Sequence, residues 1–303
     1  MEWDKGIAFN NSTYADTGAI PEASPIGLRK REPMDSLEYW NLRAETFGGM
    51  NARTHAGLQG GCAVGYMPRL IEKLALEDGQ SVFDMGCANG TLAIPLARAG
   101  HVVTARDFSQ RMIERLQAAA QAEELPIDAA LMAWEDDWEA CGIHGKSADV
   151  AVASRSLPYR EAELEDALCK LDRVARLKVA VTVSATSAPA YDERLCEYLG
   201  RDIPVPKGHV HVIDALAEMR RLPEVSYIPF ERPMRFADKD MAWLELRKLA
   251  GEETLDAHEE ELFERYAAEH FTVQEVDGQT VYQLDYCLDV EWAFICWPTG
   301  NDL

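Results

Sequence analysis

Short apolar runs alternate with amphipathic segments in the middle of the chain. Beyond Gly79, five runs rich in valine and alanine are bounded by polar or glycine-containing turns and predict strands at 81–84, 101–106, 127–133, 148–154 and 177–185. Between them, apolar residues recur at helical spacing in segments that begin near Asn89, Ser109 and Glu161. Buried strands that alternate with helices are typical of a parallel sheet covered on both faces. The pattern therefore predicts an α/β core over residues 79–185.

The segments on either side of this core follow other patterns. Residues 1–34 contain prolines without periodicity and predict an irregular arm, whereas residues 35–78 predict two short helices. After the core, residues 186–303 are expected to complete the sheet around an inserted helical cover, at about 190–222 and 237–270. The elements predicted there are helices near 191–199, 212–221, 238–250 and 254–269, a strand over 225–230, and a final strand pair over 281–288 and 292–297.

The composition narrows the class of protein. The 303 residues carry a formal net charge of -22, which opposes binding to phosphate backbones and disfavours a nucleic-acid substrate. The apolar runs fall short of the ~18 residues that a membrane-spanning helix needs, and the polar, acidic start lacks the features of a secretory signal. Seven cysteines without a Cys-x-x-Cys pair favour free thiols, and no cluster of metal ligands is evident. We therefore expect a cytoplasmic protein without membrane, nucleic-acid or metal partners.

The most specific motif is the turn after the first predicted strand. Residues 82–90 read Val-Phe-Asp-Met-Gly-Cys-Ala-Asn-Gly, a strand that ends in Asp84 and a turn with Gly86 and Gly90 that opens a helix. Glycine permits backbone conformations and a close ligand approach that a Cβ forbids, and the helix N-terminus offers unpaired amide donors. The alternative is a plain strand-to-helix turn in another α/β protein.

This stretch resembles motif I of class I S-adenosylmethionine (SAM) dependent methyltransferases, which is written acid-x-Gly-x-Gly-x-Gly and often found as Asp-x-Gly-Cys-x-x-Gly. Asp84, Gly86, Cys87 and Gly90 match, whereas Ala88 replaces the frequent middle glycine. The resemblance implies a Rossmann-like, seven-stranded methyltransferase sheet, mostly parallel with an antiparallel last strand, plus a helical cover. It also implies SAM as cofactor and S-adenosylhomocysteine as product, with Asp84 organising the turn or facing the SAM amine.

The next two strand ends carry candidate residues for the same cofactor. Asp107 ends the second strand, and an acid about 20 residues beyond the glycines accepts hydrogen bonds from ribose hydroxyls in nucleotide-binding folds. Asp107 could instead cap the following helix, although Ser109 competes for that position. By the resemblance, Phe108 packs against adenine, and Trp134 and Glu135 border it after the third strand. Trp134 stands where the family usually has an acid, so the adenine amine contact is expected to pass to Glu135 or Asp136, unless this segment is a solvated acidic turn.

Acceptor recognition is expected to begin at the end of the fourth strand, because ligands bind at the carboxyl edge of open α/β sheets. Three candidate residues lie there: Ser154 for contact with the cofactor, and Arg155 and Ser156 for contact with the acceptor. The loop resembles that of small-molecule methyltransferases of the ubiquinone or menaquinone type. The later helices have the place of an acceptor-binding cover.

The remaining candidates are a lid and a base. The helix with Tyr39 and Trp40 resembles the N-terminal lid helix of many small-molecule methyltransferases. Transfer from a sulfonium needs positioning and exclusion of water more than a base. If the acceptor is a hydroxyl or an activated carbon, His209, His211 and Tyr159 are candidate bases, and the alternative is that they are polar loop residues.

The sequence therefore predicts a SAM-dependent methyltransferase that acts by in-line displacement on a small-molecule acceptor. It leaves open the identity of the acceptor and the oligomeric state of the protein. Two alternatives remain, an NAD-dependent oxidoreductase and a catalytically silent SAM-binding protein. The first is disfavoured because Gly86 and Gly90 are spaced Gly-x-x-x-Gly, whereas pyrophosphate binding needs Gly-x-Gly-x-x-Gly.

Overall fold

The computed structural model describes residues 37, 40, 44, 62–158, 161–187, 190–203, 208–236, 238–251, 255–276 and 279–299. The predicted arm at 1–34 lies outside these residues, as do Tyr39, Tyr159 and most of the predicted helix after residue 35. Of that helix, Leu37 and Trp40 are described and helical, and the Ala44 amide donates to the Trp40 carbonyl at 2.9 Å.

An eight-stranded sheet runs through the molecule in the order β3-β2-β1-β4-β5-β8-β6, with β7 pairing to β8 beyond this path. The first five strands pair in parallel, whereas β8 is antiparallel to β5, β6 and β7. The strands are β1 (Val82–Met85), β2 (Val103–Asp107), β3 (Ile127–Leu131), β4 (Ala148–Ser154), β5 (Ala175–Ser184), β6 (Glu224–Phe236), β7 (Phe271–Val276) and β8 (Gln279–Pro298). The predicted fold class, mostly parallel with an antiparallel last strand, is confirmed, but the sheet has eight strands rather than the predicted seven because β7 adds to β8.

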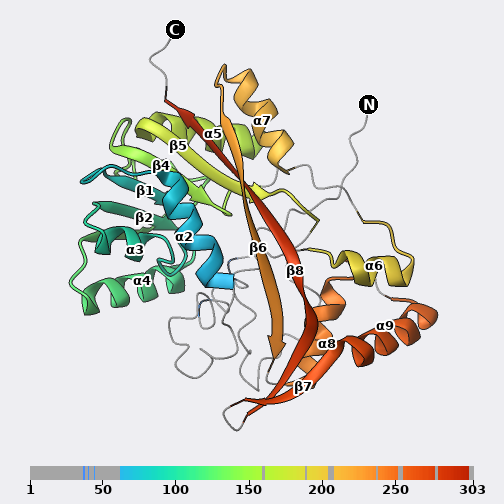
Figure 1. The fold of residues 1–303 in the computed structure, drawn as a ribbon. Coiled ribbons are helices and arrows are strands. Elements are labelled where there is room, and N and C mark those ends of the chain that lie inside the picture. Colours follow the sequence, from blue (N-terminus) through green and yellow to red (C-terminus); the bar gives the residue numbers. More distant parts are fainter. Residues whose placement is uncertain are drawn as a thin grey trace.

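Helices cover both faces of this sheet (Figure 1). One hydrophobic cluster joins it to α2 (Cys62–Leu74), α3 (Ala93–Arg98) and α4 (Gln110–Ala122), and a second joins it to α5 (Glu161–Val174) and α7 (Gly208–Glu218). Within β4, Val150 and Val152 belong to the first cluster, and Ala151 and Ala153 belong to the second. Burial on both sides explains why the core strands are apolar throughout.

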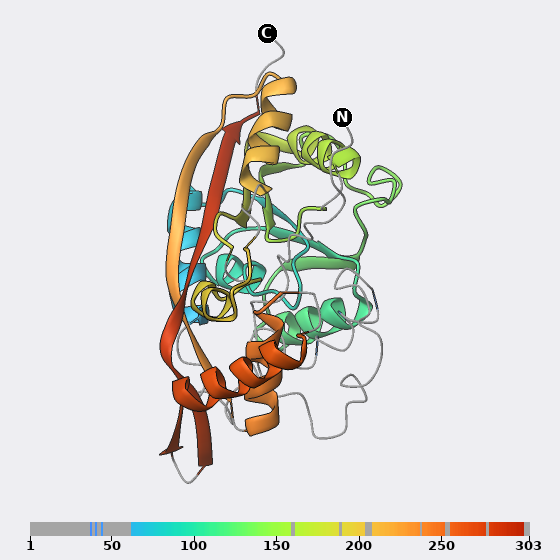
Figure 2. The same ribbon diagram turned by 90° about the vertical axis from the view of Figure 1, so that its right-hand side faces the viewer.

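The two longest strands extend beyond the core sheet. Figures 1 and 2 show β6 and β8 running from the core to a group formed by α8 (Lys239–Lys248), α9 (Ala257–His270) and β7, with α6 (Glu193–Leu199) beside α9. In the sequence, α8, α9 and β7 lie between β6 and β8. The two helices that the sequence predicts before the last strand, α8 and α9, are therefore present. We call α8, α9 and β7 together the cover.

The predicted final strand pair is wrong, because β8 is one continuous strand. Its predicted break contains Asp289, which is exposed, and Glu291, which is partly exposed. Leu288, Val290 and Trp292 alternate with them and are buried. Polar residues at every second position mark a strand with one buried face rather than a break.

Two further strands differ from the sequence prediction. β6 continues beyond the predicted residues 225–230, although Pro229 and Pro233 interrupt its pattern. β6 is the last strand in the sheet order, and an edge strand tolerates proline because one side of its backbone needs no partner. β7 was not predicted; it pairs with the start of β8 from Phe271 to Val276.

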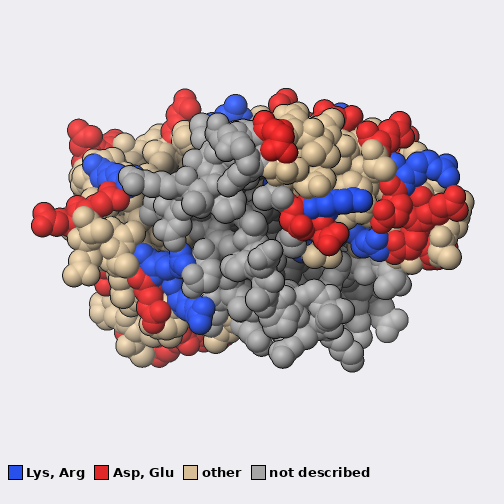
Figure 3. All heavy atoms as spheres, turned by 90° about the horizontal axis from the view of Figure 1, so that it is seen from below, with Lys and Arg blue, Asp and Glu red and all other residues tan. Residues whose placement is uncertain are grey.

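Charged side chains of both signs share the surface of the cover. On the face seen in Figure 3, acidic and basic side chains are interspersed over the described residues. Arg247 pairs with Glu260 and Glu264, and Lys248 pairs with Glu245. Local pairs therefore neutralise part of the acidic excess here. Within the described ranges, no helix combines the length and the apolar character needed to cross a membrane.

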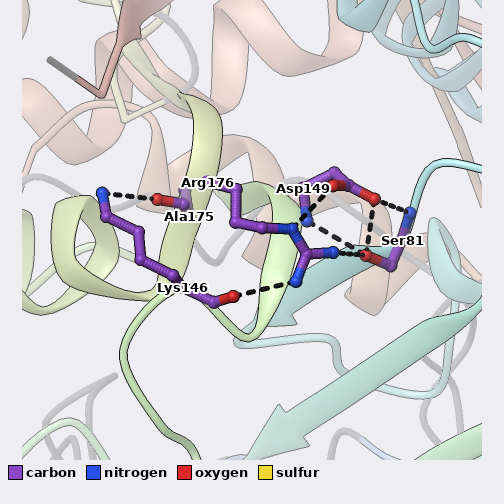
Figure 4. Close-up of polar contacts among 5 residues, drawn as sticks. All are labelled: Ser81, Lys146, Asp149, Ala175 and Arg176. Atoms are coloured by element: carbon purple, nitrogen blue, oxygen red, sulfur yellow. Dashed lines mark hydrogen bonds and ion pairs between the residues drawn. The ribbon is translucent and has the colours of Figure 1, made fainter. Parts of the chain in front are cut away.

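A polar cluster joins the amino ends of three core strands (Figure 4). Asp149 accepts hydrogen bonds from the Arg176 Nε through one oxygen and from the Ser81 amide and hydroxyl through the other, each at 2.8 Å. Arg176 also donates to the Lys146 carbonyl at 2.8 Å. The hydrogen bond from Arg176 has the largest effect on the pKa of Asp149, and the hydrogen bond from the Ser81 amide has the next largest. Together they lower this pKa to about 2. The cluster therefore ties β1, β4 and β5 together through an ionised carboxylate.

Replacing Asp149 by Asn is expected to lower the free energy of unfolding at pH 7 by about 1–2 kcal/mol, because charge-assisted hydrogen bonds are lost. Since the folded-state pKa lies below the ordinary 3.8, the wild-type advantage is fully present above about pH 4 and shrinks as the pH falls toward 2. Urea unfolding at pH 7 and near pH 3 measures both effects. The exposed Glu114, changed to Gln, is the control. An equal deficit at both pH values would contradict a role for the Asp149 charge.

Candidate functional site

The turn after β1 is held by the backbone of β2. The Gly86 and Cys87 amides both donate to the Arg106 carbonyl, at 2.7 and 3.0 Å. Gly86 has a φ of +77°, and a Cβ built there would lie 2.2 Å from the Cβ of Ser156, in the loop after β4. Glycine is therefore needed at this position for both its conformation and its close contact. Gly90 is similar, because a Cβ there would lie 2.4 Å from a leucine of α4. Burial raises the pKa of the Cys87 thiol well above its usual range, so that Cys87 packs as a neutral side chain.

Ala88, which departs from the glycine motif, connects this turn to the predicted lid helix. Its φ is +48°, and its amide donates to Oδ2 of Asp107 at 2.9 Å. It forms a small cluster with Ala44 and Met112, and Trp40 packs against that cluster. The residue at the middle-glycine position therefore makes an apolar contact that glycine would lack.

Two buried carboxyl groups lie at the ends of β1 and β2. The exposed fraction is 1% for Asp84 and 6% for Asp107. Burial, with the neighbouring Asp107 charge, raises the pKa of Asp84 to about 7. Burial raises the pKa of Asp107 to about 6, against the opposing effect of two backbone hydrogen bonds. Oδ2 of Asp84 is buried and accepts no hydrogen bond from the described residues.

Asp107 anchors the loops rather than capping the next helix. Its Oδ1 accepts from the Ser109 amide at 2.9 Å, while Oδ2 accepts from Ala88. Ser109 is the N-cap of α4 and accepts from the Met112 amide. Each carboxylate oxygen has two lone pairs, so both retain capacity for a further donor such as a ribose hydroxyl.

The loops after β3 and β4 meet at Trp134. Its indole Nε1 donates to the Ser156 carbonyl at 2.7 Å, and its ring packs on Trp138 with centroids 5.5 Å apart. Ser156 Oγ donates to the Met85 carbonyl at 2.6 Å. Ser156 thus links Trp134 to the glycine turn by hydrogen bonds. Glu135, by contrast, is exposed. The assignment of Phe108, Trp134 and Glu135 to adenine stays a prediction.

Arg155 and Ser154 face an aromatic group that the sequence did not reveal. The Tyr66 hydroxyl is hydrogen-bonded to Ser154 Oγ at 2.9 Å and to Thr182 Oγ1 at 2.7 Å. The Arg155 guanidinium lies over the rings of Tyr66 and Trp292. Tyr66 is 88 and 116 positions from its two partners, so that no local motif could indicate this contact.

Of the candidate bases, His209 and His211 are described, and they do not gather with these residues. His209 and His211 lie near the start of α7, whose buried side chains belong to the cluster on the face opposite Tyr66. The His209 and Tyr227 ring centroids are 6.5 Å apart, and His211 is exposed. Their catalytic role stays a prediction. In the described part of the chain, no three His, Cys, Asp or Glu side chains form a group that could hold a metal ion.

Residues 82–177 match a protein family described as a methyltransferase domain. The chain is 30% identical over 168 residues to an uncharacterised protein of Haemophilus influenzae, covering 55% of this chain and 60% of the relative. It is 28% identical over 176 residues to the malonyl-[acyl-carrier protein] O-methyltransferase of Erwinia billingiae, covering 57% of this chain and 65% of the relative. The chain thus spans less than two thirds of the length of these relatives.

A similar solved structure is that of the YcgJ protein from Bacillus subtilis. Its TM-score is 0.47 at 12% identity, covering 78% of this chain and 98% of that one. Neither relative named above is described as a quinone methyltransferase, so the quinone-type subtype stays a prediction.

Substituting Gly86 by Ala is expected to destabilise the fold more than Gly79→Ala. Both glycines have nearly the same positive φ, but a Cβ at Gly79 meets nothing within 4 Å. Gly79→Ala should cost about 1 kcal/mol for its backbone conformation, and Gly86→Ala about 1–3 kcal/mol more for its overlap with Ser156. Urea unfolding measures both, and Ser156→Gly in the Gly86→Ala background should recover part of the loss. Equal costs at the two glycines would contradict the close-contact argument.

Replacing Asp84 by Asn is expected to stabilise the ligand-free protein at pH 8 by on the order of 2 kcal/mol, because a buried, mutually repelling charge is removed. The folded-state pKa is raised, so the wild-type carboxyl is most destabilising above pH 7, and its penalty shrinks as the pH falls toward 4. Thermal and urea unfolding at pH 5 and pH 8 measure the difference.

The matched comparison is Asp107→Asn, which should destabilise because an amide group cannot accept both backbone hydrogen bonds. The same sign of change for both variants at pH 8 would overturn the distinction between the two acids.

Proposed function

We propose that the protein transfers a methyl group from SAM to a small-molecule acceptor, on the premise that residues 82–177 match a methyltransferase domain and carry a turn that resembles motif I of the class I SAM-dependent family. The observation that carries the proposal is the buried Asp84 oxygen without a hydrogen-bond donor beside the glycine turn. A buried carboxylate without a donor is costly, and the α-amino group of SAM would supply both a donor and a positive charge. The residues present therefore fit this cofactor.

The chain contributes binding and alignment at this edge. Asp84 would hold the amine of SAM, while Asp107 retains lone pairs for the ribose hydroxyls. Ala88 and its contact with Trp40 would place the predicted lid helix over the turn and exclude water. SAM supplies a methyl group on a positively charged sulfur, which is already a good leaving group. Positioning donor and acceptor in line is then the main task of the protein.

We propose oxygen as the methylated atom. The relative from Erwinia billingiae is named as an O-methyltransferase, and this supports oxygen over nitrogen or carbon. The NAD-dependent alternative is not favoured, because the family match is to a methyltransferase domain and the glycine spacing does not suit a pyrophosphate. A silent SAM-binding protein remains the outcome to test against.

Calorimetric titration is expected to show binding of SAM and S-adenosylhomocysteine but not of NAD. Asp107→Ala should weaken SAM binding about 100-fold or more, because it removes a ligand contact and frees the Ala88 amide. Asp84→Asn should also weaken SAM binding, although it is expected to stabilise the ligand-free fold. This opposite pair of effects separates a role in binding from a role in folding.

The control is Asp149→Asn at the far edge of the sheet, which should leave the affinity for SAM unchanged. Binding of NAD, or an unaltered affinity in both Asp84 and Asp107 variants, would overturn the assignment of this site. Tight SAM binding without transfer to any acceptor would indicate the silent SAM-binding protein.

A further inference from the structure

A strained cation lies at the point where β4 leaves the sheet. Arg155 follows β4 directly and has a φ of +58°, a left-handed conformation that long side chains rarely adopt. Its amide donates to the carbonyl and to the hydroxyl of Thr182 on β5, each at 3.1 Å. The neighbouring strand thus fixes the strained residue. Strain of this kind gathers at functional sites.

Two rigid rings hold the guanidinium of this residue. Its central carbon lies 4.5 Å from the ring centroid of Tyr66 and 5.5 Å from that of Trp292. Both rings are buried, and Tyr66 is further fixed by its hydrogen bonds to Ser154 and Thr182. Arg155 itself is partly exposed. A guanidinium packed over aromatic faces presents its donors at the edge of its plane, where a planar anion can meet them.

This cation stands beside the methyl-donor site. Ser156, the next residue, lies against Gly86 and donates to the Met85 carbonyl at the end of β1. An anion bound by Arg155 would therefore be close to the turn assigned to SAM.

The charge of the chain makes such a cation significant. The net charge of -22 repels anionic ligands, and Asp84 and Asp107 lie at the same edge of the sheet. An anionic acceptor would need a fixed positive group to approach this edge. Arg155 supplies one, and its planar donor fork matches a carboxylate.

We propose that Arg155 binds the carboxylate of the methyl acceptor, so that the product is a methyl ester; this rests on the proposed function. One carboxylate oxygen attacks the methyl carbon, a C–O bond forms, and the C–S bond breaks with its electron pair passing to sulfur. The products are a neutral ester and S-adenosylhomocysteine. No proton has to be removed, because a carboxylate is already ionised near neutral pH. Bidentate pairing with Arg155 selects the carboxylate over a neutral alcohol or amide.

The test uses tritium-labelled SAM with two sets of acceptors. The first contains linear mono- and dicarboxylic acids from acetate and malonate to dodecanoate, each matched with its primary amide and alcohol. The second is a small-molecule extract of bacterial cells. Alkali releases labelled methanol from a methyl ester but not from an ether or a methylamine, so the assay identifies the methylated group without identifying the acceptor.

Arg155→Gln is expected to raise KM for the carboxylate about 10- to 100-fold while the affinity for SAM changes little. Arg155→Lys, which keeps the charge but lacks the fork, should fall between. A second readout is calorimetric binding of the best carboxylate in the presence of S-adenosylhomocysteine, weakened to the same extent by Arg155→Gln. The control is Arg98→Gln, at an exposed ion pair with Glu123 at the end of α3, which should change neither quantity.

Alkali-stable label, or alkali-labile label that Arg155→Gln does not reduce, would overturn the carboxylate assignment and leave methyl transfer standing. SAM binding with no label in either set would overturn both this assignment and the proposed function.

Discussion

The cofactor edge of the sheet depends on two backbone hydrogen bonds to one buried carboxylate. Asp107 accepts from Ala88 in the turn after β1 and from Ser109 at the start of α4, so that loops from adjacent strands share one anchor. Burial alone would make the ionised acid costly, and the two amides offset part of that cost. The hydrogen bond from the Ala88 amide to this acid also holds Ala88 in a left-handed backbone conformation, which favours glycine. Neither the acid nor the turn would be stable in this form without the other.

The two edges of the core sheet contrast in their energetics. At the amino ends of the strands, Asp149 is bound by Arg176 and Ser81, and its pKa is lowered. At the carboxyl ends, burial raises the pKa values of Asp84 and Asp107, the Asp107 charge adds to the shift at Asp84, and an oxygen of Asp84 lacks a donor among the described residues. Left-handed Ala88 and Arg155 lie at this edge as well. The parallel core is thus secured at one end and carries strain and uncompensated charge at the other, which is where ligands bind in open α/β sheets.

Sequence patterns predicted the features that depend on neighbours in the chain. The five core strands, the glycine turn and the competition between Asp107 and Ser109 for the N-cap follow from local periodicity and turn chemistry, and the structure gives the cap to Ser109. The features that were missed depend on distant partners. Strand β7 exists because it pairs with β8, and β8 was divided in two because one-sided burial resembles a break when its partners are unknown. The contact of Tyr66 with Thr182 had no local signal at all.

The continuity of β8 links the cover to Arg155. The Arg155 guanidinium lies over the ring of Trp292, which belongs to the half of β8 that pairs with β5. The first residues of β8 pair instead with β7, beside the helices of the cover. Between these ends, β6 and β8 share a ladder from Glu224 to Phe236 with one irregularity near Pro233. Backbone hydrogen bonds therefore set where the cover stands relative to the cation. For an acceptor that is held by Arg155 at one end, the distance to the cover would be fixed by this ladder, so that side chains rather than strand movement would decide which acceptors fit.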